Sequence, residues 1–558
     1  MVKRFFSFLS KEIIGLHEAA YLLGFFAICS QVLALFRDRI LASSFGAGNI
    51  LDIYYSAFRI PDILFVTVAS IVSVSVLIPF LMERMEKGEK EAKDFIDTVF
   101  SFFFIFVSVS GIIAYVFTPT IMAKLFPMFV DSDSFSELIK LTRVLILSPV
   151  FLGFSNLLAS ITQLNRRFFL YAVSPVMYNL GIIFGIKVLY PILGLTGLGY
   201  GVILGTILHF SIQVPYIVKK GMFPKFTFRI KYDFVKKIVL TSLPRTITVS
   251  ANEIAELFLV SFASFFVVGS ISIFNFSFNL QSVPFSIIGI SYSLAAFPTL
   301  TRLFSSGNRG EFVNQMIMSS RHIIFWSVPV SVLFIVLRAQ IVRVILGAGR
   351  FNWDDTRLTA AALALFTISL VAQNLVTLFV RSYYSQGKTK TPLILNVVSA
   401  LIIVLSSYYF IFLFKTNVYF KFFIESIMKV SDIPGTIVLM LPLGFSFGLF
   451  FSLVVHWWGF SKHFSDFSKP VFRTFFQTVS ASVIMGYVSY VSLNILDGVL
   501  NINTLMGIFL QGFISGVLGI ISAVIVLYIL DSQELKEVWT TLHHKIWKAK
   551  IVPPDPEL

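Results

Sequence analysis

The chain has 558 residues, of which 56% are hydrophobic and only 13% are charged. A soluble protein of this size needs far more charge to cover its surface, and 64 phenylalanines would leave large apolar patches facing water. We therefore expect most of the chain to lie in lipid. Cys29 is the only cysteine, which excludes an internal disulfide and a cysteine-based metal site.

The formal net charge of +15 comes from basic residues that lie in short runs between apolar segments. Such runs favour the cytoplasmic loops of a membrane protein over a nucleic acid partner. An expected inner loop carries Lys219 and Lys220, whereas the outer loop near Asp131 and Asp133 is acidic. Because the expected number of spans is even, both termini should lie in the cytoplasm.

Apolar stretches of about 20 residues, the length that crosses the hydrocarbon core, recur along the whole chain. Because these runs are continuous rather than alternating, they predict helices and not a barrel. We expect an all-α polytopic membrane protein with about fourteen transmembrane helices. In chain order, the expected spans are 19–36, 63–82, 98–123, 144–164, 168–186, 188–218, 235–266, 271–300, 316–337, 358–380, 391–414, 433–455, 474–496 and 499–530.

A weak internal repeat relates the two halves of the chain. Pro79 is followed by Gly88 after the second expected span, and Pro298 by Gly307 after the eighth. An offset of six spans keeps the same orientation, so this would be a parallel six-plus-six repeat. The expected parts are an N-terminal lobe 1–225 with spans one to six, a C-terminal lobe 226–460 with spans seven to twelve, and 461–558 with two extra C-terminal helices and a basic tail.

Some apolar spans contain charged residues, which are costly in lipid unless they face a cavity or a partner. Arg37 and Asp38 lie near the end of the first span, where they either line a cavity or form a cluster at the membrane interface. Arg59 precedes a proline, which suits a broken helix that faces a cavity. The alternative for Arg59 is an ion pair with Asp52 or Asp62 that only holds helices together.

The seventh expected span contains Arg245, Glu253 and Glu256. The two glutamates are three positions apart and therefore share one face of a helix. Two acids on one face inside a membrane predict a cation or proton site. The alternative is an ion pair with Arg245 or with an arginine of the other half.

Short motifs follow one another between Gln31 and Pro392. The first half contains Leu-Phe-Arg-Asp at 35–38, Phe-Gly-Ala-Gly at 45–48 and Ala-Phe-Arg-Ile-Pro-Asp at 57–62. The second half contains Val-Pro-Phe-Ser-Ile-Ile-Gly at 283–289, Phe-Pro-Thr-Leu at 297–300 and the segment 384–392. In this order the motifs resemble the MurJ/MviN lipid II flippase family of the multidrug/oligosaccharidyl-lipid/polysaccharide exporter superfamily. The last third of the chain matches this family by topology only.

The resemblance implies two six-helix lobes around a V-shaped central cavity, with a groove on the two extra helices for a lipid tail. It implies that the cargo is lipid II, a polyprenyl diphosphate that carries a disaccharide-pentapeptide. Alternating access would move this cargo from the inner to the outer leaflet of a bacterial inner membrane for cell-wall synthesis. Cavity arginines would bind the anionic diphosphate. The expected partners are this polyprenyl-linked saccharide, membrane lipids and cell-wall synthesis proteins. No cofactor is expected, because the family is thought to use the membrane potential or a Na⁺ or H⁺ gradient and not ATP.

Departures from the family fall among the residues expected to bind the cargo. Gln31 and Asn279 stand where the family has arginines, and Phe65-Val66 replaces a basic pair. Either Arg59 and Arg245 take over the binding, or the cargo differs, or transport is lost. The expected substrate-binding residues are Gln31, Arg37, Asp38, Asp52, Arg59, Arg245 and Asn279. The expected ion-coupling residues are Asn252, Glu253 and Glu256.

Three other functions remain open at this point. The chain could move another polyprenyl-linked saccharide with a less anionic headgroup. It could be a cation- or proton-coupled drug exporter of the same superfamily, or a non-transporting scaffold for cell-wall assembly. An enzyme is the least expected class, because the sequence contains no Walker-type loop, zinc-binding helix motif or nucleophile elbow.

Overall fold

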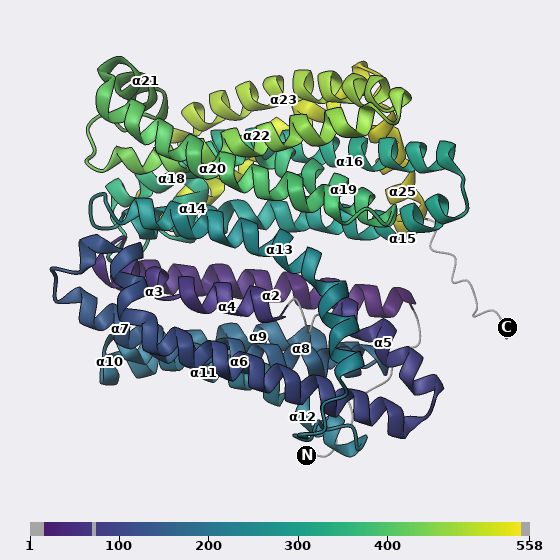
Figure 1. Cartoon of the computed structure of the whole chain (residues 1–558). Helices are drawn as coiled ribbons and strands as arrows, with labels where there is room; N and C mark the ends of the chain where they lie inside the picture. Colours follow the sequence, from purple (N-terminus) through teal and green to yellow (C-terminus); the bar gives the residue numbers. More distant parts are fainter. Residues whose placement is uncertain (1–15, 70–73, 548–558) are drawn as a thin grey trace. The chain divides into compact units, whose positions relative to one another are not determined.

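The computed structural model describes residues 16–69 and 74–547, and every regular element in these ranges is a helix (Figure 1). Eleven of the described segments are long and apolar enough to cross a membrane. A twelfth span is formed if α18 (Trp353–Ile368) and α19 (Leu370–Ser385), which meet at a bend of 42°, are counted together. The predicted all-α polytopic membrane fold is therefore confirmed.

The predicted number of about fourteen spans is compatible with these helices. The first expected span lies in α2 (Leu16–Phe45), which continues beyond the charged segment around Arg37. The second expected span includes α4 (Arg59–Ala69) and α5 (Val74–Glu86), and the residues between these two helices fall outside the described part of the chain. The number fourteen itself stays a prediction.

The chain divides into two compact units, each assembled from segments that are discontinuous in sequence. The first unit comprises Met1–Leu280, Ile345–Ala362 and Thr389–Gly448. The second comprises Gln281–Val344, Leu363–Lys388 and Leu449–Leu558. The expected lobes and the six-plus-six repeat stay predictions.

Most helices belong wholly to one unit, and a few run from one unit into the other. The remaining helices of the first unit are α3 (Asn49–Ala57), α6 (Glu89–Leu125), α7 (Ser134–Leu145), α8 (Ser148–Leu164), α9 (Phe168–Phe184), α10 (Tyr190–Leu193), α11 (Leu195–Ser211), α12 (Val214–Lys219), α13 (Tyr232–Ala263), α20 (Lys390–Thr416) and α21 (Val418–Met428). Those of the second are α15 (Ser291–Ser305), α16 (Arg309–Val336), α23 (Ser468–Asp497), α24 (Leu505–Ile529) and α25 (Gln533–Trp547). The helices that cross between units are α14 (Ser270–Phe285), α17 (Arg338–Ile345), α18 and α22 (Met440–Ser461). The short 3₁₀ and π segments are η1 (Pro127–Phe129), η2 (Gly185–Leu189), η3 (Ser286–Ile290), η4 (Thr436–Leu439) and η5 (Ser465–Phe467).

Glycines allow α9 to lie directly against α11 in the first unit. A Cβ built on Gly181 of α9 would lie 2.2 Å from the Cα of Gly205 on α11. One built on Gly201 would lie 2.4 Å from the Cα of Gly185. Because small residues permit this close backbone approach, they are the usual basis of helix packing in lipid. The contact fixes the position of α9.

A buried carboxylate joins α3 to the beginning of α14. Asp52 accepts hydrogen bonds from the backbone N–H of Gly269 at 2.6 Å, and from the N–H and hydroxyl of Ser272 at 2.8 Å and 2.6 Å. These N–H groups lie at a helix start, where they lack partners within the helix and favour a negative charge. Gly269 has a φ of +96°, and a Cβ there would lie 2.3 Å from the carbonyl oxygen of Ala47. The expected separation of spans seven (235–266) and eight (271–300) is confirmed, since α13 ends at Ala263 and α14 begins at Ser270.

In the second unit, α23 packs along both α24 and α16. Gly486 of α23 provides room for this, because a Cβ on it would lie 2.8 Å from the side chain of Val332 on α16. At one end of these helices, Leu535 and Val538 of α25 pack against a small apolar cluster that includes Phe325. The last helix is therefore held on the membrane-spanning helices by apolar contacts.

Candidate functional site

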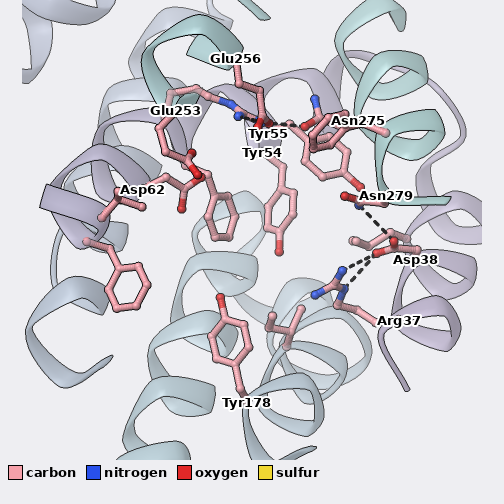
Figure 2. Close-up of a pocket in the computed structure, with 17 residues that line it drawn as sticks. Arg37, Asp38, Tyr54, Tyr55, Asp62, Tyr178, Glu253, Glu256, Asn275 and Asn279 are labelled. Atoms are coloured by element: carbon pink, nitrogen blue, oxygen red, sulfur yellow. Dashed lines mark hydrogen bonds and ion pairs between the residues drawn. The ribbon is translucent and has the colours of Figure 1, made fainter. Parts of the chain in front are cut away.

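A cavity of about 390 Å³ lies inside the first unit, where side chains from α2, α3, α4, α9, α13 and α14 meet (Figure 2). Its wall combines charged groups, amides and aromatic rings within a unit that is otherwise strongly apolar. The lining residues are Arg37, Asp38, Leu41, Tyr54, Tyr55, Phe58, Arg59, Asp62, Phe65, Val66, Tyr178, Ile182, Glu253, Glu256, Asn275, Phe278 and Asn279.

The first arginine of the cavity forms an ion pair with its neighbour in sequence. Arg37 donates to one oxygen of Asp38 from Nε at 2.9 Å and from Nη2 at 2.8 Å. Its Nη1 donates to the side-chain oxygen of Asn179 on α9 at 3.1 Å. The other oxygen of Asp38 accepts from Asn279 on α14 at 3.1 Å. Arg37 and Asp38 thus connect α2 with α9 and α14, and they face the cavity (Figure 2).

The second arginine also connects several helices. Arg59 on α4 donates from Nη1 to Glu256 on α13 at 2.6 Å, and from Nη2 to Asn275 on α14 at 2.6 Å. Its Nε is buried and has no hydrogen-bond partner among the residues that the structure describes. Arg59 is therefore both an ion-pair partner and a donor that still has an unused N–H group.

Two carboxylates in the cavity remain unpaired. The carboxylates of Asp62 and Glu253 line the cavity but form neither a hydrogen bond nor an ion pair with any residue in the described ranges. Figure 2 shows their carboxylate groups turned toward one another. With all groups ionised, the cavity holds two positive charges, on Arg37 and Arg59, and four negative ones, so its own charge is negative.

Aromatic side chains complete the cavity wall. The ring of Tyr54 meets those of Tyr55 and Phe58 edge to face, with centroids 5.4 Å and 4.9 Å apart. The hydroxyl of Tyr55 is buried, and the part of the chain that the structure describes offers it no hydrogen-bond partner. Tyr178 extends from α9 into the cavity (Figure 2). This wall offers apolar faces together with hydroxyl groups.

The structure brings together Arg37, Asp38, Arg59, Asn279, Glu253 and Glu256 out of the ten residues expected from the sequence. Of the other four, Gln31, Asp52 and Asn252 do not line the cavity. Asp52 makes the contacts to α14 described above. Gln31 is half-buried on α2, Asn252 is exposed on α13, and the side chain of Arg245 lies outside the described part of the structure. The substrate-binding and ion-coupling roles assigned to all ten residues stay predictions.

Tyr178, Asn179 and Asn275 belong to this site but were not among the expected site residues. The sequence could have indicated Asn179 as a site residue, because a polar amide in an otherwise apolar span is costly unless it has a partner or faces a cavity. There was no such indication for Tyr178, since a tyrosine in a transmembrane helix is also common at the membrane interface.

Comparison with known proteins relates residues 41–419 of the chain to one protein family. The family model described as "Lipid II flippase MurJ" matches residues 41–419. The "Probable lipid II flippase MurJ" of Buchnera aphidicola subsp. Schizaphis graminum is 26% identical over 400 residues, which cover 70% of this chain and 77% of that protein. The "Lipid II flippase MurJ" of Burkholderia cenocepacia is 24% identical over 407 residues, which cover 71% and 78%.

Two solved structures share the fold of the chain. One is "Lipid II flippase MurJ, inward closed conformation", with a TM-score of 0.72, 22% identity, and coverage of 93% of this chain and 100% of that one. The other is the inward-facing conformation of a multidrug resistance MATE family transporter of the MOP superfamily, with a TM-score of 0.64, 16% identity, and coverage of 79% and 96%. At these identities the likeness concerns the fold alone.

Proposed function

Because this chain belongs to the lipid II flippase MurJ family, we propose that it moves lipid II from the inner to the outer leaflet of a bacterial inner membrane for cell-wall synthesis. The observation that carries this proposal is the pair of arginines, Arg37 and Arg59, that faces a cavity within an apolar, membrane-spanning unit. A diphosphate is anionic and suits guanidinium groups, which bind phosphate oxygens through paired, charge-assisted hydrogen bonds.

In this proposal the carboxylates beside the arginines act as substitutes for the cargo. Removing the partner of a buried charge is strongly destabilising, so Asp38 and Glu256 compensate the two guanidinium groups while the cavity is empty. The diphosphate then takes over these hydrogen bonds. The aromatic wall formed by Tyr54, Tyr55 and Tyr178 would contact the sugar part of the headgroup.

Coupling to an ion gradient forms the second part of the proposal. Asp62 and Glu253 are the unpaired carboxylates of the cavity. A proton or a sodium ion bound between them would reduce the negative charge of the cavity and favour entry of an anionic cargo. Glu256 is engaged by Arg59, so Glu253 is the better coupling residue of the two.

The cavity is also compatible with a related cargo. Its negative charge would favour a polyprenyl-linked saccharide with a less anionic headgroup, and a non-transporting role in cell-wall assembly would not use the cavity at all. Association with cell-wall synthesis proteins and the cytoplasmic location of both termini are further expectations of this proposal.

Complementation of a flippase-depleted bacterium tests the proposed function. We expect the chain to restore growth, and the Arg37→Ala variant to restore it much less at equal membrane abundance. Failure of the unaltered, membrane-inserted chain to restore growth would favour the other cargo. Full rescue by variants at both Arg37 and Arg59 would remove the cavity from the mechanism.

A further inference from the structure

A second cavity, of about 570 Å³, lies in the second unit between α16, α23 and the beginning of α25. Its walls carry four basic side chains, Arg321, Lys469, Arg473 and Lys536, and one acidic side chain, Asp531. None of these residues belongs to the cavity described above. We call this second cavity the basic pocket.

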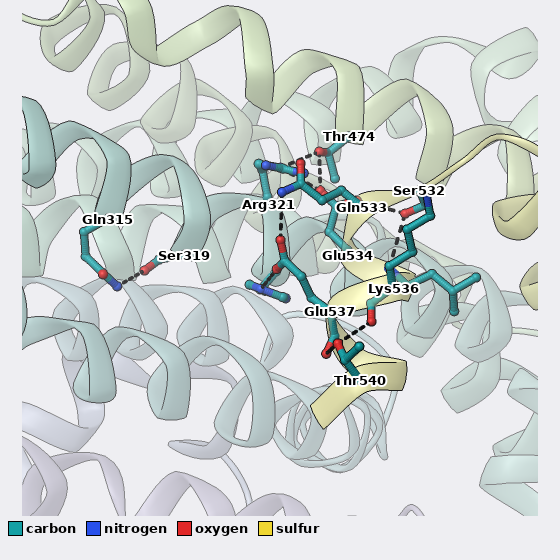
Figure 3. A network of polar contacts seen from close by, with 12 residues as sticks. Gln315, Ser319, Arg321, Thr474, Ser532, Gln533, Glu534, Lys536, Glu537 and Thr540 are labelled. Atoms are coloured by element: carbon teal, nitrogen blue, oxygen red, sulfur yellow. Dashed lines mark hydrogen bonds and ion pairs between the residues drawn. The ribbon is translucent and has the colours of Figure 1, made fainter. Parts of the chain in front are cut away.

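One wall of the basic pocket is built around a buried carboxylate (Figure 3). Glu534 of α25 accepts hydrogen bonds from Arg321 at 2.6 Å, from Thr474 at 2.6 Å and from Ser532 at 2.9 Å. Arg321 also donates to Gln533 at 3.0 Å. This network holds α25 on α16 and α23, and it compensates the charge of Arg321.

Two cations of the basic pocket remain without such a partner. Asp531 pairs with Lys536, so both of these charges are compensated. The side chains of Lys469 and Arg473, in contrast, form no ion pair or hydrogen bond within the described ranges, although the charge of Asp531 also attracts Arg473, and both side chains are exposed. They are four positions apart on α23, so they lie on the same face, where two like charges are unfavourable without an anion. The arrangement therefore suits an anionic ligand.

The helix α25 adds to this preference for an anion. It begins at Gln533, which lines the basic pocket, and the hydroxyl of Ser532 accepts a hydrogen bond from the backbone N–H of Leu535 at 3.5 Å. The positive end of the helix dipole lies at this terminus, although the backbone N–H groups of Glu534 and Leu535 are already engaged by the side chains of Glu534 and Ser532.

The position of the basic pocket along the chain indicates where the ligand comes from. The candidate membrane span α24 ends at Ile529, only two residues before Asp531, and α23 begins at Ser468, beside Lys469. Trp539 of α25 is 70% exposed, and tryptophan is enriched at the level of lipid headgroups. Basic pockets between transmembrane helices at this level bind phosphate-bearing lipid headgroups.

We propose that the basic pocket binds the headgroup phosphate of an anionic phospholipid. Lys469 and Arg473 donate charge-assisted hydrogen bonds to the phosphate, and the positive end of the α25 helix dipole lies on the same side of the pocket. The bound lipid joins α23 to α25. This site is separate from the cargo cavity, so it does not depend on the identity of the cargo.

Native mass spectrometry of the purified full-length chain tests this proposal. The ligand probes are phosphatidylglycerol, phosphatidylcholine and inorganic phosphate. The test variant combines Lys469→Gln with Arg473→Gln. The matched control combines Lys388→Gln with Lys390→Gln, which removes the same charge at exposed positions outside the basic pocket. A Lys469→Arg, Arg473→Lys variant keeps both charges and checks that the pocket tolerates substitution.

We expect the unaltered chain, the control and the charge-keeping variant to retain phosphatidylglycerol over phosphatidylcholine. The test variant should bind phosphatidylglycerol roughly tenfold more weakly or worse. Three results would overturn the proposal: no preference for phosphatidylglycerol, an equal loss in the control, or retention of inorganic phosphate with no retention of lipid. Thermal unfolding of each variant separates lost binding from lost folding, and a test variant that folds and binds normally also refutes the site.

Discussion

Arg59 on α4 donates a hydrogen bond of 2.6 Å to Glu256 on α13, so a single ion pair inside the cavity joins two helices far apart in sequence. The guanidinium is almost fully buried and the carboxylate is partly exposed to the cavity, with 7% and 21% of their side-chain areas accessible. This pair can therefore serve both the stability of the fold and the binding of a cargo, and substitutions can separate the two roles.

The Arg59→Ala variant should lose both stability and transport. Removing one partner of a buried pair costs about 3–5 kcal/mol, because the remaining charge is left uncompensated. The double variant Arg59→Gln, Glu256→Gln removes both charges and should regain most of this free energy of unfolding, yet remain inactive. Thermal unfolding in detergent and complementation of a flippase-depleted strain measure the two effects. A double variant that is both stable and active would show that the pair is only structural.

The Arg37→Ala variant should reduce translocation while the chain still inserts into the membrane. Its guanidinium faces the cavity and holds Asp38 and Asn179, so its loss removes a cargo donor and leaves Asp38 negative. Arg309→Ala is the matched control, because Arg309 is exposed and lies outside the cavity. Transport rates should be compared at equal protein abundance, and equal rates for both variants would contradict a role of Arg37 in binding.

The Glu253→Gln variant should make transport insensitive to the ion gradient and slower. Glu253 is one of the two unpaired cavity carboxylates. The glutamine that replaces it has an amide, which cannot gain or lose a proton. Glu137→Gln, at an exposed loop-side position, should behave like the unaltered chain. The measurement is transport into liposomes with and without collapse of the proton and sodium gradients. Unchanged gradient dependence in Glu253→Gln would disprove coupling at this residue.

The Gly201→Ala variant should destabilise the first unit. Its new Cβ would lie 2.4 Å from the Cα of Gly185, so α11 and α9 must separate, and overpacking of this kind costs about 1–3 kcal/mol. Gly24→Ala introduces the same methyl group where nothing lies within 4 Å, and it should be neutral or slightly stabilising. Unfolding temperatures of the two variants check this, and equal temperatures would contradict the close α9–α11 contact.

The contact between α25 and the spans should weaken in acid. Burial alone would raise the pKa of Glu534, but hydrogen bonds from Thr474 and Ser532 and the charge of Arg321 outweigh burial and hold the pKa below its usual value. A lowered carboxyl pKa contributes stability that is fully present above the ordinary pKa of about 4.3 and is lost as the pH falls through the folded-state value.

Unfolding temperatures between pH 7 and pH 3 test this prediction with the Glu534→Gln variant and an exposed control, Glu311→Gln. Glu534→Gln should be less stable than the unaltered chain at pH 7, by roughly 1–3 kcal/mol. The difference should shrink in acid. A difference that stays constant with pH would show that the lowered pKa has no part in holding α25.

The sequence predicted the fold well because lipid imposes simple rules on a chain. Every span must be a long apolar helix, so the boundaries of α20 lie within two residues of the expected 391–414, whereas α6 begins nine residues before its expected start at 98. The charge-free run from Leu257 to Thr301 exceeds the length of one helix, and Gly269 within it indicated the break that separates α13 from α14. The division into units joined from discontinuous segments has no comparable local signal.

The cavity was predicted only in part. Charge inside an apolar span is visible in the sequence, which is why Arg37, Arg59 and Glu253 were expected and do line the cavity. Asp52 accepts hydrogen bonds from backbone N–H groups. Such donors occur in nearly every residue type, so the sequence does not indicate this contact. The basic pocket joins α16, α23 and α25, and nothing in their separate sequences indicates that they meet.

The most direct test of the central claim is a flipping assay with the purified chain in liposomes, using lipid II and a polyprenyl lipid with a neutral headgroup. We predict that the chain moves lipid II much faster than the neutral lipid, and that the double variant Arg59→Gln, Glu256→Gln abolishes this preference. Equal rates for the two lipids, or an unchanged preference in the variant, would contradict the proposal that the arginines of this cavity bind a diphosphate.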